Sequence, residues 1–227
     1  MNFPIIQKTY QFECTRCGNC CSGEQLVNLN PYDLYKMALY KGYNHTKELF
    51  DNNLVHLVQS QNNAWIPQIK FKSIKRKQRQ KFCPFLINEL DEHDKLMGLC
   101  SLHPHKKPLI CAMAPVGRIQ DFKSNSEEYI FVKPAADCPG VDIQKENKLS
   151  DLIQSKKKEL HYEKRFLKML DVLNQQYLTP EFYYKSFYSF STGKIFENIL
   201  QEIECDDDDN QIECGGIPQS IKKWMYL

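Results

Sequence analysis

The stretch Cys14-Thr15-Arg16-Cys17-Gly18-Asn19-Cys20-Cys21 places four cysteines within eight residues. Two residues separate Cys14 from Cys17 and Cys17 from Cys20, so a short loop can turn these three thiols towards one centre, and Cys21 follows directly. Cysteine loops with this spacing are typical of metal sites. The stretch therefore predicts a fold that is organised around a cysteine-bound metal.

Four more cysteines stand in distinctive settings. Cys83 begins Cys-Pro-Phe-Leu, Cys100 follows Gly98-Leu99, Cys111 comes three residues after Pro108, and Cys138 begins Cys-Pro-Gly. Zinc takes four ligands and an iron–sulfur cluster takes one cysteine per iron, so eight thiolates are enough for two centres. The predicted metal ligands are Cys14, Cys17, Cys20, Cys21, Cys83, Cys100, Cys111 and Cys138.

The spacing favours an iron–sulfur cluster and leaves zinc as the other option. Bacterial ferredoxins hold three corners of a four-iron cluster with the Cys-x2-Cys-x2-Cys loop, and proline follows their remote fourth cysteine. Here both Cys83-Pro84 and Cys138-Pro139 have that form. The loop differs from the Cys-x3-Cys-x2-Cys spacing of radical enzymes that use S-adenosylmethionine, so spacing does not support that mechanism.

The adjacent Cys20 and Cys21 constrain the geometry of the site. Successive side chains of an extended segment point to opposite sides, so we expect these two thiols to serve different ions. A single iron–sulfur cluster with spare, reactive thiols is the alternative, and His103 or His105 as a nitrogen ligand is another. Cys205 and Cys214 flank the acidic run Asp206–Asp209 and are expected to lie outside the ligand set.

Length and composition restrict the class of protein. With 227 residues, 42% of them hydrophobic, the chain can bury one sizeable core with an extension. The formal net charge of +2 is too small to indicate nucleic acid or a membrane surface as partner. We expect no signal peptide and no membrane span. Ten cysteines in such a chain favour a reducing compartment, and we predict a cytoplasmic protein.

The order of patterns predicts an α+β fold with a small antiparallel sheet around a cysteine-rich metal-binding core. Asn30-Pro31-Tyr32-Asp33 predicts a helix start, Gly42 a stop, and a second helix is expected from Thr46 to Val58. Short strands are expected at 64–71, 82–87, 96–100, 116–122 and 128–133. Helical periodicity follows from Leu149, with a restart at Thr179-Pro180 and a last helix near 195–203. The predicted domains are 1–142, the cysteine-cluster part, and 143–227, a helical extension packed on it.

The combined motifs resemble a known family. They are Phe12-x-Cys14-x2-Cys17-Gly18-x-Cys20-Cys21, Val27-x-Leu29 with Asp33, Cys83-Pro84-Phe85-Leu86, Gly98-x-Cys100, Lys107-Pro108-x2-Cys111, and Cys138. Over about residues 10 to 140 the chain is similar to the cysteine-cluster (YkgJ-type) family, described as zinc- or iron-chelating and including flagellin lysine N-methylase. Where that family has arginines around the position of Cys111, this chain has Lys107 and Ala112.

The resemblance implies a chelated metal and, more remotely, a reaction. By likeness to the methylase, the chain would transfer a methyl group from S-adenosylmethionine to a lysine of a protein substrate. The sequence has no Gly-x-Gly-x2-Gly loop for a nucleoside, so the metal site would have to hold the donor. The alternatives are a metal-handling protein and a binding module that engages a partner through its C-terminal helices or the basic segment Lys70–Lys81.

Overall fold

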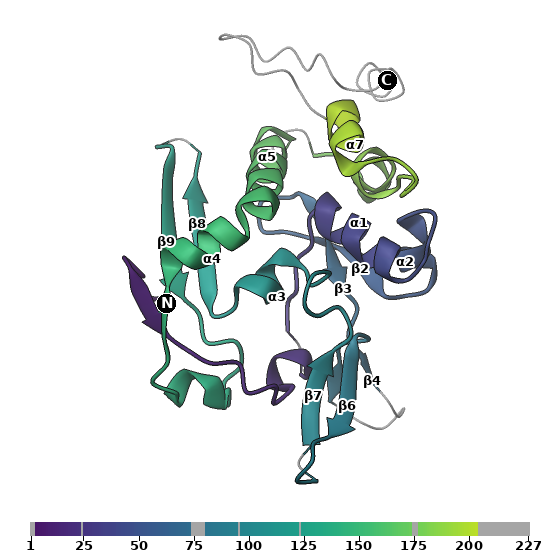
Figure 1. Ribbon diagram of the computed structural model, residues 1–227. Helices are drawn as coiled ribbons and strands as arrows, with labels where there is room; N and C mark the ends of the chain where they lie inside the picture. Colours follow the sequence, from purple (N-terminus) through teal and green to yellow (C-terminus); the bar gives the residue numbers. More distant parts are fainter. Residues whose placement is uncertain are drawn as a thin grey trace. The chain divides into compact units, whose positions relative to one another are not determined.

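The computed structural model describes residues 3–23, 25–73, 80–94, 96–122, 124–173 and 177–203. It confirms an α+β chain of helices and antiparallel strands (Figure 1). The strands do not form the one small sheet that the sequence predicts. In the described part of the chain they form five separate two-stranded sheets, because each strand pairs with one partner.

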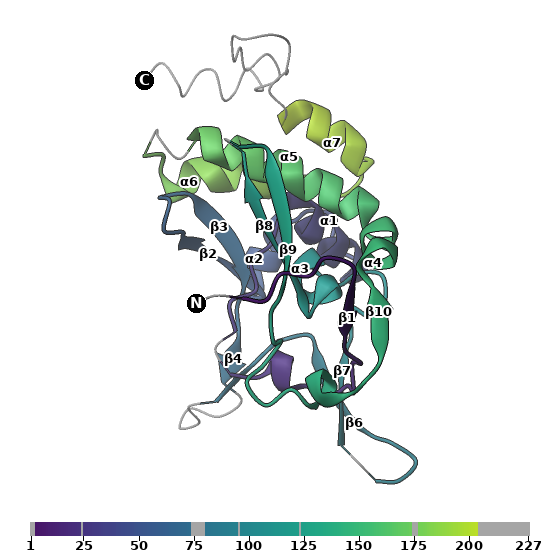
Figure 2. The ribbon, with the colours of Figure 1, turned by 90° about the vertical axis from the view of Figure 1, so that its left-hand side faces the viewer.

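The strands are short and mostly hairpin-connected. They are β1 (Thr9–Gln11), β2 (Val55–Gln59), β3 (Trp65–Ile69), β4 (Lys72–Ser73), β5 (Lys81–Phe82), β6 (Leu86–Leu90), β7 (Leu96–Cys100), β8 (Val116–Asp121), β9 (Ser126–Phe131) and β10 (Glu146–Lys148). Four sheets join consecutive strands, and the fifth joins β1 to β10 across most of the chain (Figure 2). Strands expected near 64–71, 96–100, 116–122 and 128–133 are confirmed.

Helices and short helical turns are interspersed with the strands up to β10 and make up most of the described chain after it. They are the 3-10 turn η1 (Asn19–Cys21), α1 (Pro31–Tyr40), α2 (Lys47–Asp51), α3 (Leu109–Met113), the 3-10 turn η2 (Pro139–Asp142), α4 (Leu149–Ser155), α5 (Lys157–Leu173), α6 (Pro180–Tyr183), the π-helical turn η4 (Tyr184–Tyr188) and α7 (Phe196–Ile203). The predicted helical character beyond Leu149 is confirmed. No helix of the described residues is long and apolar enough to cross a membrane.

The chain forms two compact units that alternate along the sequence. The first combines Met1–Leu29 with Ile69–His161, and the second combines Asn30–Gln68 with the chain from Tyr162. All eight predicted ligands lie in the first unit. Residues 143–161 add β10 and α4 to that unit, and the boundary predicted after residue 142 stays a prediction.

The first helix begins as its sequence predicts. The Asn30 side chain accepts a hydrogen bond from the Asp33 N–H at 2.9 Å, and the Asp33 carboxylate accepts one from the Asn30 N–H at 3.3 Å. Pro31 occupies the first helical turn, where a missing N–H costs nothing. Gly42, with φ of 69°, follows the helix as predicted. This reciprocal capping explains why α1 starts at Pro31.

The second helix is shorter than predicted. The helix expected up to Val58 ends at Asp51, and Val55–Gln59 form the strand β2 instead. Asn53 takes a left-handed φ of 54°, which breaks the helix. The β-branched Val55 and Val58 then suit a strand. The helical spacing of apolar residues was therefore misleading in this segment.

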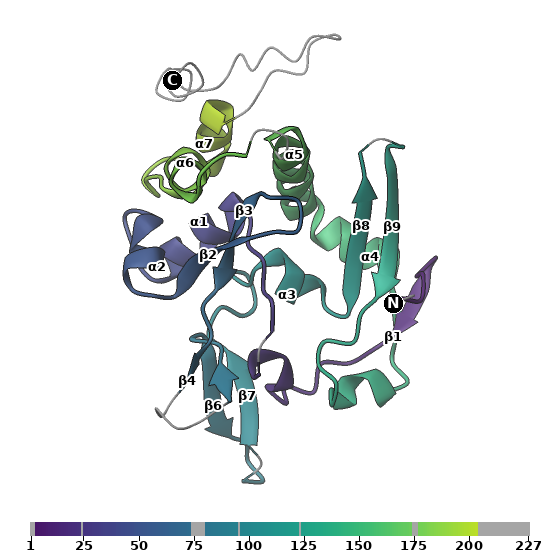
Figure 3. The same ribbon diagram turned by 180° about the vertical axis from the view of Figure 1, so that it is seen from behind.

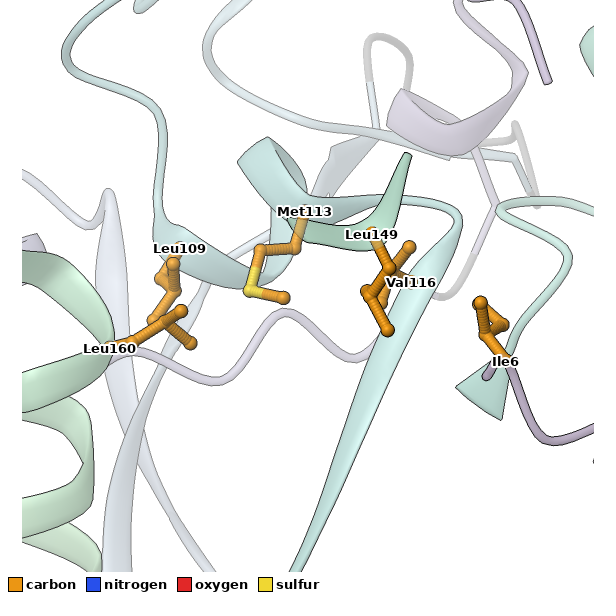
Figure 4. Packing of buried hydrophobic residues seen from close by; sticks show 6 residues of the cluster. All are labelled: Ile6, Leu109, Met113, Val116, Leu149 and Leu160. Atoms are coloured by element: carbon orange, nitrogen blue, oxygen red, sulfur yellow. The ribbon is translucent and has the colours of Figure 1, made fainter. Parts of the chain in front are cut away.

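The core of the first unit gathers around α3. It is formed by Ile6, Leu109, Met113, Val116, Leu149 and Leu160, which Figure 4 shows from close by. Leu109 and Met113 lie four positions apart on one face of α3 and are almost completely buried. They hold the helix that carries Cys111 against β8 and the start of α4.

The second unit has an aromatic core. Its buried residues Tyr162, Phe196, Ile199 and Leu200 are packed against the partly buried Tyr32, Tyr35 and Phe190. The rings of Tyr32 and Phe196 lie 4.8 Å apart between centroids, and the Tyr162 hydroxyl donates to the Glu197 carboxylate at 2.7 Å. This core contains none of the predicted ligands.

Candidate metal centre

The cysteine-rich stretch folds as a tight turn. Residues Asn19–Cys21 form η1, and the Cys21 N–H donates to the Gly18 carbonyl at 2.8 Å. Gly18 has φ of 76°, a left-handed conformation that glycine adopts without strain. None of the eight described cysteines forms a disulfide; Cys83 and Cys138 are buried, Cys14 and Cys20 exposed, and the other four half-buried.

One contact fixes the turn against β7. The Gly98 N–H donates to the Arg16 carbonyl at 2.7 Å, and Cys17 forms a parallel β-bridge with Gly98. A Cβ atom on Gly98 would lie 2.6 Å from the Gly18 nitrogen, closer than real Cβ contacts come. The two backbones can therefore touch only because both positions are glycine. Gly98 stands two residues before Cys100 in the sequence, and Figure 3 shows the cysteine-rich turn beside β7.

A second contact joins the turn to Cys83. The Cys83 N–H donates to the Cys21 carbonyl at 2.8 Å, and Ser22 forms an antiparallel bridge with Phe82. The Leu86 N–H donates to the Cys83 carbonyl at 3.1 Å and closes the turn that leads into β6. Cys21 and Cys83 thus lie on paired segments, with buried Phe85 anchoring the turn.

A third contact brings in Cys138. The Asn19 side chain donates to the Asp137 carbonyl at 3.1 Å, and the Glu13 N–H donates to the Gly140 carbonyl at 3.1 Å. A Cβ atom on Gly140 would overlap the Glu13 carbonyl oxygen. Two backbone segments that are far apart in sequence therefore meet closely on both sides of Cys138.

The thiols of Cys20, Cys21 and Cys83 are linked. The Cys20 thiol donates to Cys21, and the Cys21 thiol donates to Cys83. The expectation that Cys20 and Cys21 point to opposite sides is wrong, because both lie in the 3-10 turn η1 and not in an extended segment. Their hydrogen bond places the two sulfurs side by side.

This arrangement raises the pKa of several thiols. The pKa of Cys20 is raised by its hydrogen bond to Cys21, then by partial burial and the Cys21 charge. For Cys21 the hydrogen bond from Cys20 lowers the pKa, but the bond to Cys83, burial and the neighbouring thiol charges outweigh it and raise the pKa to about 12. Burial raises the pKa of Cys100 and Cys138. The thiolates repel one another, which is the condition that a bound cation relieves.

Electrostatic neighbours divide the cysteines into two groups. The charges that act on Cys138 belong to Cys17, Cys20 and Cys14, the three members of the Cys-x2-Cys-x2-Cys loop. The charges that act on Cys21 belong to Cys83 and Cys100. Cys20 belongs to both groups, because Cys21 has the largest effect on its pKa and its own charge acts on Cys100. Cys111 is half-buried in the middle of α3.

His103 and His105, the alternative nitrogen ligands, lie on the turn after β7. His103 and His105 are both exposed, and the His103 N–H donates to the Cys100 carbonyl at 2.9 Å. Burial lowers the pKa of His103, and the charges of Lys107, Arg16 and His105 lower it further. Lys107 also acts on Cys20 and Cys100. Basic groups therefore border the thiols on this side.

Cysteine thiolates are suitable ligands for zinc and iron. In this structure, however, the thiols of Cys20, Cys21 and Cys83 are hydrogen-bonded to one another. Thiolate ligands select zinc and iron–sulfur clusters. Within the described residues, no three or more His, Cys, Asp or Glu side chains are grouped so that they could hold an ion. The predicted metal-binding core is thus not shown as such. Rotation about the single side-chain torsion of each cysteine would redirect its sulfur without moving the backbone.

Sequence reasoning found the cysteines but not the residues that hold their segments together. Gly98, Gly140 and Asn19 make these contacts. The signals were present, since Gly98 stands two residues before Cys100 and Gly140 two residues after Cys138. Cys205, Cys214 and Asp206–Asp209 lie outside the described residues, as do residues 74–79 of the basic segment.

Comparison with known proteins identifies the family of this site. No curated protein matches the chain, and no solved structure does. A family model, CxxCxxCC, with the description "Putative zinc- or iron-chelating domain", matches residues 13–139, more than half of the 227 residues. The match spans every predicted ligand from Cys14 to Cys138, and the chain therefore belongs to the CxxCxxCC family of zinc- or iron-chelating domains.

Proposed function

We propose that this protein binds zinc or iron through the eight cysteines predicted as ligands, in two neighbouring centres. The observation that carries the proposal is the meeting of four separate cysteine-bearing segments in the first unit. The cysteine-rich turn contacts β7, the Cys83 turn and the Cys138 turn through backbone hydrogen bonds of 2.7 to 3.1 Å. Family membership supports chelation of zinc or iron in general.

The first proposed centre uses Cys14, Cys17, Cys20 and Cys138. Cys138 neighbours the three cysteines of the loop, and proline follows it, as it follows the remote ligand of bacterial ferredoxins. These four cysteines match the ligand pattern of a four-iron, four-sulfur cluster, which we propose for this centre. The contacts of Asn19 and Glu13 with residues 137–140 would hold the loop and the remote ligand together.

The second proposed centre uses Cys21, Cys83, Cys100 and Cys111. Cys21 donates to Cys83 and lies close enough to Cys100 for their charges to interact. Cys111, on a helix anchored by Leu109 and Met113, is assigned as the remaining thiol of the eight. In this assignment Cys20 and Cys21 still serve different centres, although their sulfurs lie side by side.

A bound cation would supply the positive charge that lets these thiols ionise together near neutral pH. The residues of this chain do the rest. Burial of Cys83 and Cys138 limits the access of water, and the basic group of Lys107 would offset part of the negative charge of the Cys20 and Cys100 thiolates. Nothing in these roles requires a chemical reaction, so the proposal is one of metal binding.

Single substitutions test the division into two centres. In full-length protein purified without oxygen, Cys138→Ser should remove the first centre and Cys83→Ser the second, because each centre would keep only three thiolates. We expect the two variants to differ in the metal that they lose, measured by elemental analysis, and in the absorption spectrum that remains. Identical losses and identical residual spectra would show one shared centre and contradict the assignment.

A further inference from the structure

The hairpin of β6 and β7 exposes an unusual amount of apolar surface. Six of its ten strand residues are large and apolar, and none of the ten is buried. The six are Leu86, Ile87, Leu90, Leu96, Met97 and Leu99. Figure 1 shows the hairpin projecting from the first unit. Contiguous exposed apolar groups on a folded protein mark sites of interaction.

The apolar residues occupy both faces of the hairpin. Leu90 pairs directly with Leu96, and their side chains are 64% and 60% exposed. They lie on the face that also carries Gly98, beyond the point where the cysteine-rich turn makes its contact. On the other face Ile87, 41% exposed, pairs with Leu99. A strand added beside β6 would place its side chains next to Leu90 on the first face and next to Ile87 and Glu89 on the second.

One edge of the hairpin is open. The edge of β7 meets the cysteine-rich turn, since the Gly98 N–H donates to the Arg16 carbonyl. Among the described residues β6 has no strand partner other than β7, so its outward N–H and C=O groups form an open edge. An isolated two-stranded hairpin is marginally stable, and a third strand would stabilise it.

The tip of the hairpin is acidic. Glu89, Asp91, Glu92 and Asp94 fall within six residues, interrupted by Leu90 and His93. The Glu92 side chain is 87% exposed and lies 3.6 Å from the His93 ring. Four carboxylates beside exposed leucines favour a ligand that is both cationic and apolar.

We propose that the open edge of β6 binds an extended segment of a partner protein in which lysine or arginine alternates with apolar residues. The segment adds a third strand to the hairpin. Its main chain bonds the outward groups of β6, its apolar side chains cover the Leu90–Leu96 pair, and its cations face the acidic tip. The edge of β6 carries none of the proposed metal ligands, although Cys100 ends the paired strand β7.

The test uses two labelled peptides of equal length, one alternating valine with lysine and one alternating valine with glutamate. Fluorescence anisotropy with the full-length, metal-loaded protein should show binding of the lysine peptide only. Leu90→Ser/Leu96→Ser and Glu92→Lys/Asp94→Lys should each weaken it by about tenfold or more, since each removes central contacts. Ile195→Ser is the matched control, because Ile195 is 65% exposed but lies in the second unit.

Both hairpin variants should keep the metal content and the circular dichroism of the parent, because the changed side chains are exposed. Equal binding of both peptides, or no binding of either, would overturn the proposal. Self-association of the unmodified protein that Leu90→Ser/Leu96→Ser abolishes would also overturn it, because a second copy of the chain would then occupy this edge.

Discussion

The backbones of Gly18 and Gly98 are in direct contact where the cysteine-rich turn packs against β7. A side chain on Gly98 has no room, because its Cβ would press on the Gly18 backbone. Gly140 is in the same position relative to the Glu13 carbonyl. Both contacts are between backbones, which cannot move aside as the end of a flexible side chain can. Gly98 and Gly140 therefore determine how closely β7 and the Cys138 turn approach the cysteine-rich turn.

Gly98→Ala should lower the free energy of unfolding by about 1–3 kcal/mol, the cost of overpacking a close contact. It should also reduce bound metal, because the turn moves away from Cys100. Denaturant titration and elemental analysis measure the two effects. Gly193→Ala is the control, since the new Cβ would lie 3.5 Å from the Ser191 hydroxyl oxygen, an ordinary contact distance. Equal and full metal content in both variants would show that the contact does not position the ligands.

The family of the chain could be predicted, because the spacing of its cysteines carries the signal, and the eight cysteines stay the predicted ligands. The orientation of Cys20 and Cys21 could not, because it depends on whether the backbone is extended or turned, and a 3-10 turn of three residues leaves little trace in sequence. Gly98 and Gly140 stand beside cysteines in the sequence, but the segments that they touch could not be predicted, since only the tertiary fold brings those segments together.

Helix α1 shows the same relation between sequence and structure at the scale of an element. Its capping residues are local, so its start and stop could be read from Asn30, Pro31 and Gly42. Strand β2 could not be predicted in this way, because its apolar residues also fit a helix and only the left-handed Asn53 separates it from α2. The pairing of β1 with β10 joins residues 9–11 to 146–148 and has no local signal.

The same helix contains a buried ion pair that can be tested. The Lys36 ammonium lies 3.2 Å from the Asp33 carboxylate, and their side chains are only 5% and 2% exposed. Asp33→Asn should lower the free energy of unfolding by about 3–5 kcal/mol, because a buried lysine loses its charged partner. Denaturant unfolding followed by circular dichroism measures the change.

Two variants separate this loss from a general effect of mutation. Asp51→Asn breaks the exposed pair with Lys47, at 3.1 Å, and should cost no more than about 0.5 kcal/mol. Asp33→Asn/Lys36→Met should recover much of the stability, because no buried charge remains. A cost for Asp33→Asn no greater than that for Asp51→Asn would show that the buried pair contributes little.

In the molecule as a whole, the two units have different cores, and the predicted metal ligands belong to only one of them. The eight predicted ligands lie in the first unit, while the aromatic cluster of Tyr162 and Phe196 belongs to the second. Sequence could predict the cysteine-bearing part but not the alternation of units, because residues 30–68 interrupt the first unit in the chain. Metal binding should therefore stabilise one unit more than the other.

Removal of the metal should expose this difference. Structural zinc is worth on the order of 10 kcal/mol in small domains, and its loss leaves the thiols without the cation that joins them. After chelation, hydrogen exchange should speed up in peptides that cover residues 14–21 and 83–100. Peptides that cover α1 and η4 should keep their protection. A uniform increase over both units would show that the chain unfolds as one cooperative body.

Native mass spectrometry of the anaerobically purified full chain tests the central claim most directly, since one spectrum gives the identity and number of bound metal centres. We expect a chain that carries two centres, and the same added mass in Cys205→Ser/Cys214→Ser, because those cysteines lie outside the proposed ligand set. A bare chain, or metal that the double serine variant loses and Cys14→Ser retains, would contradict it.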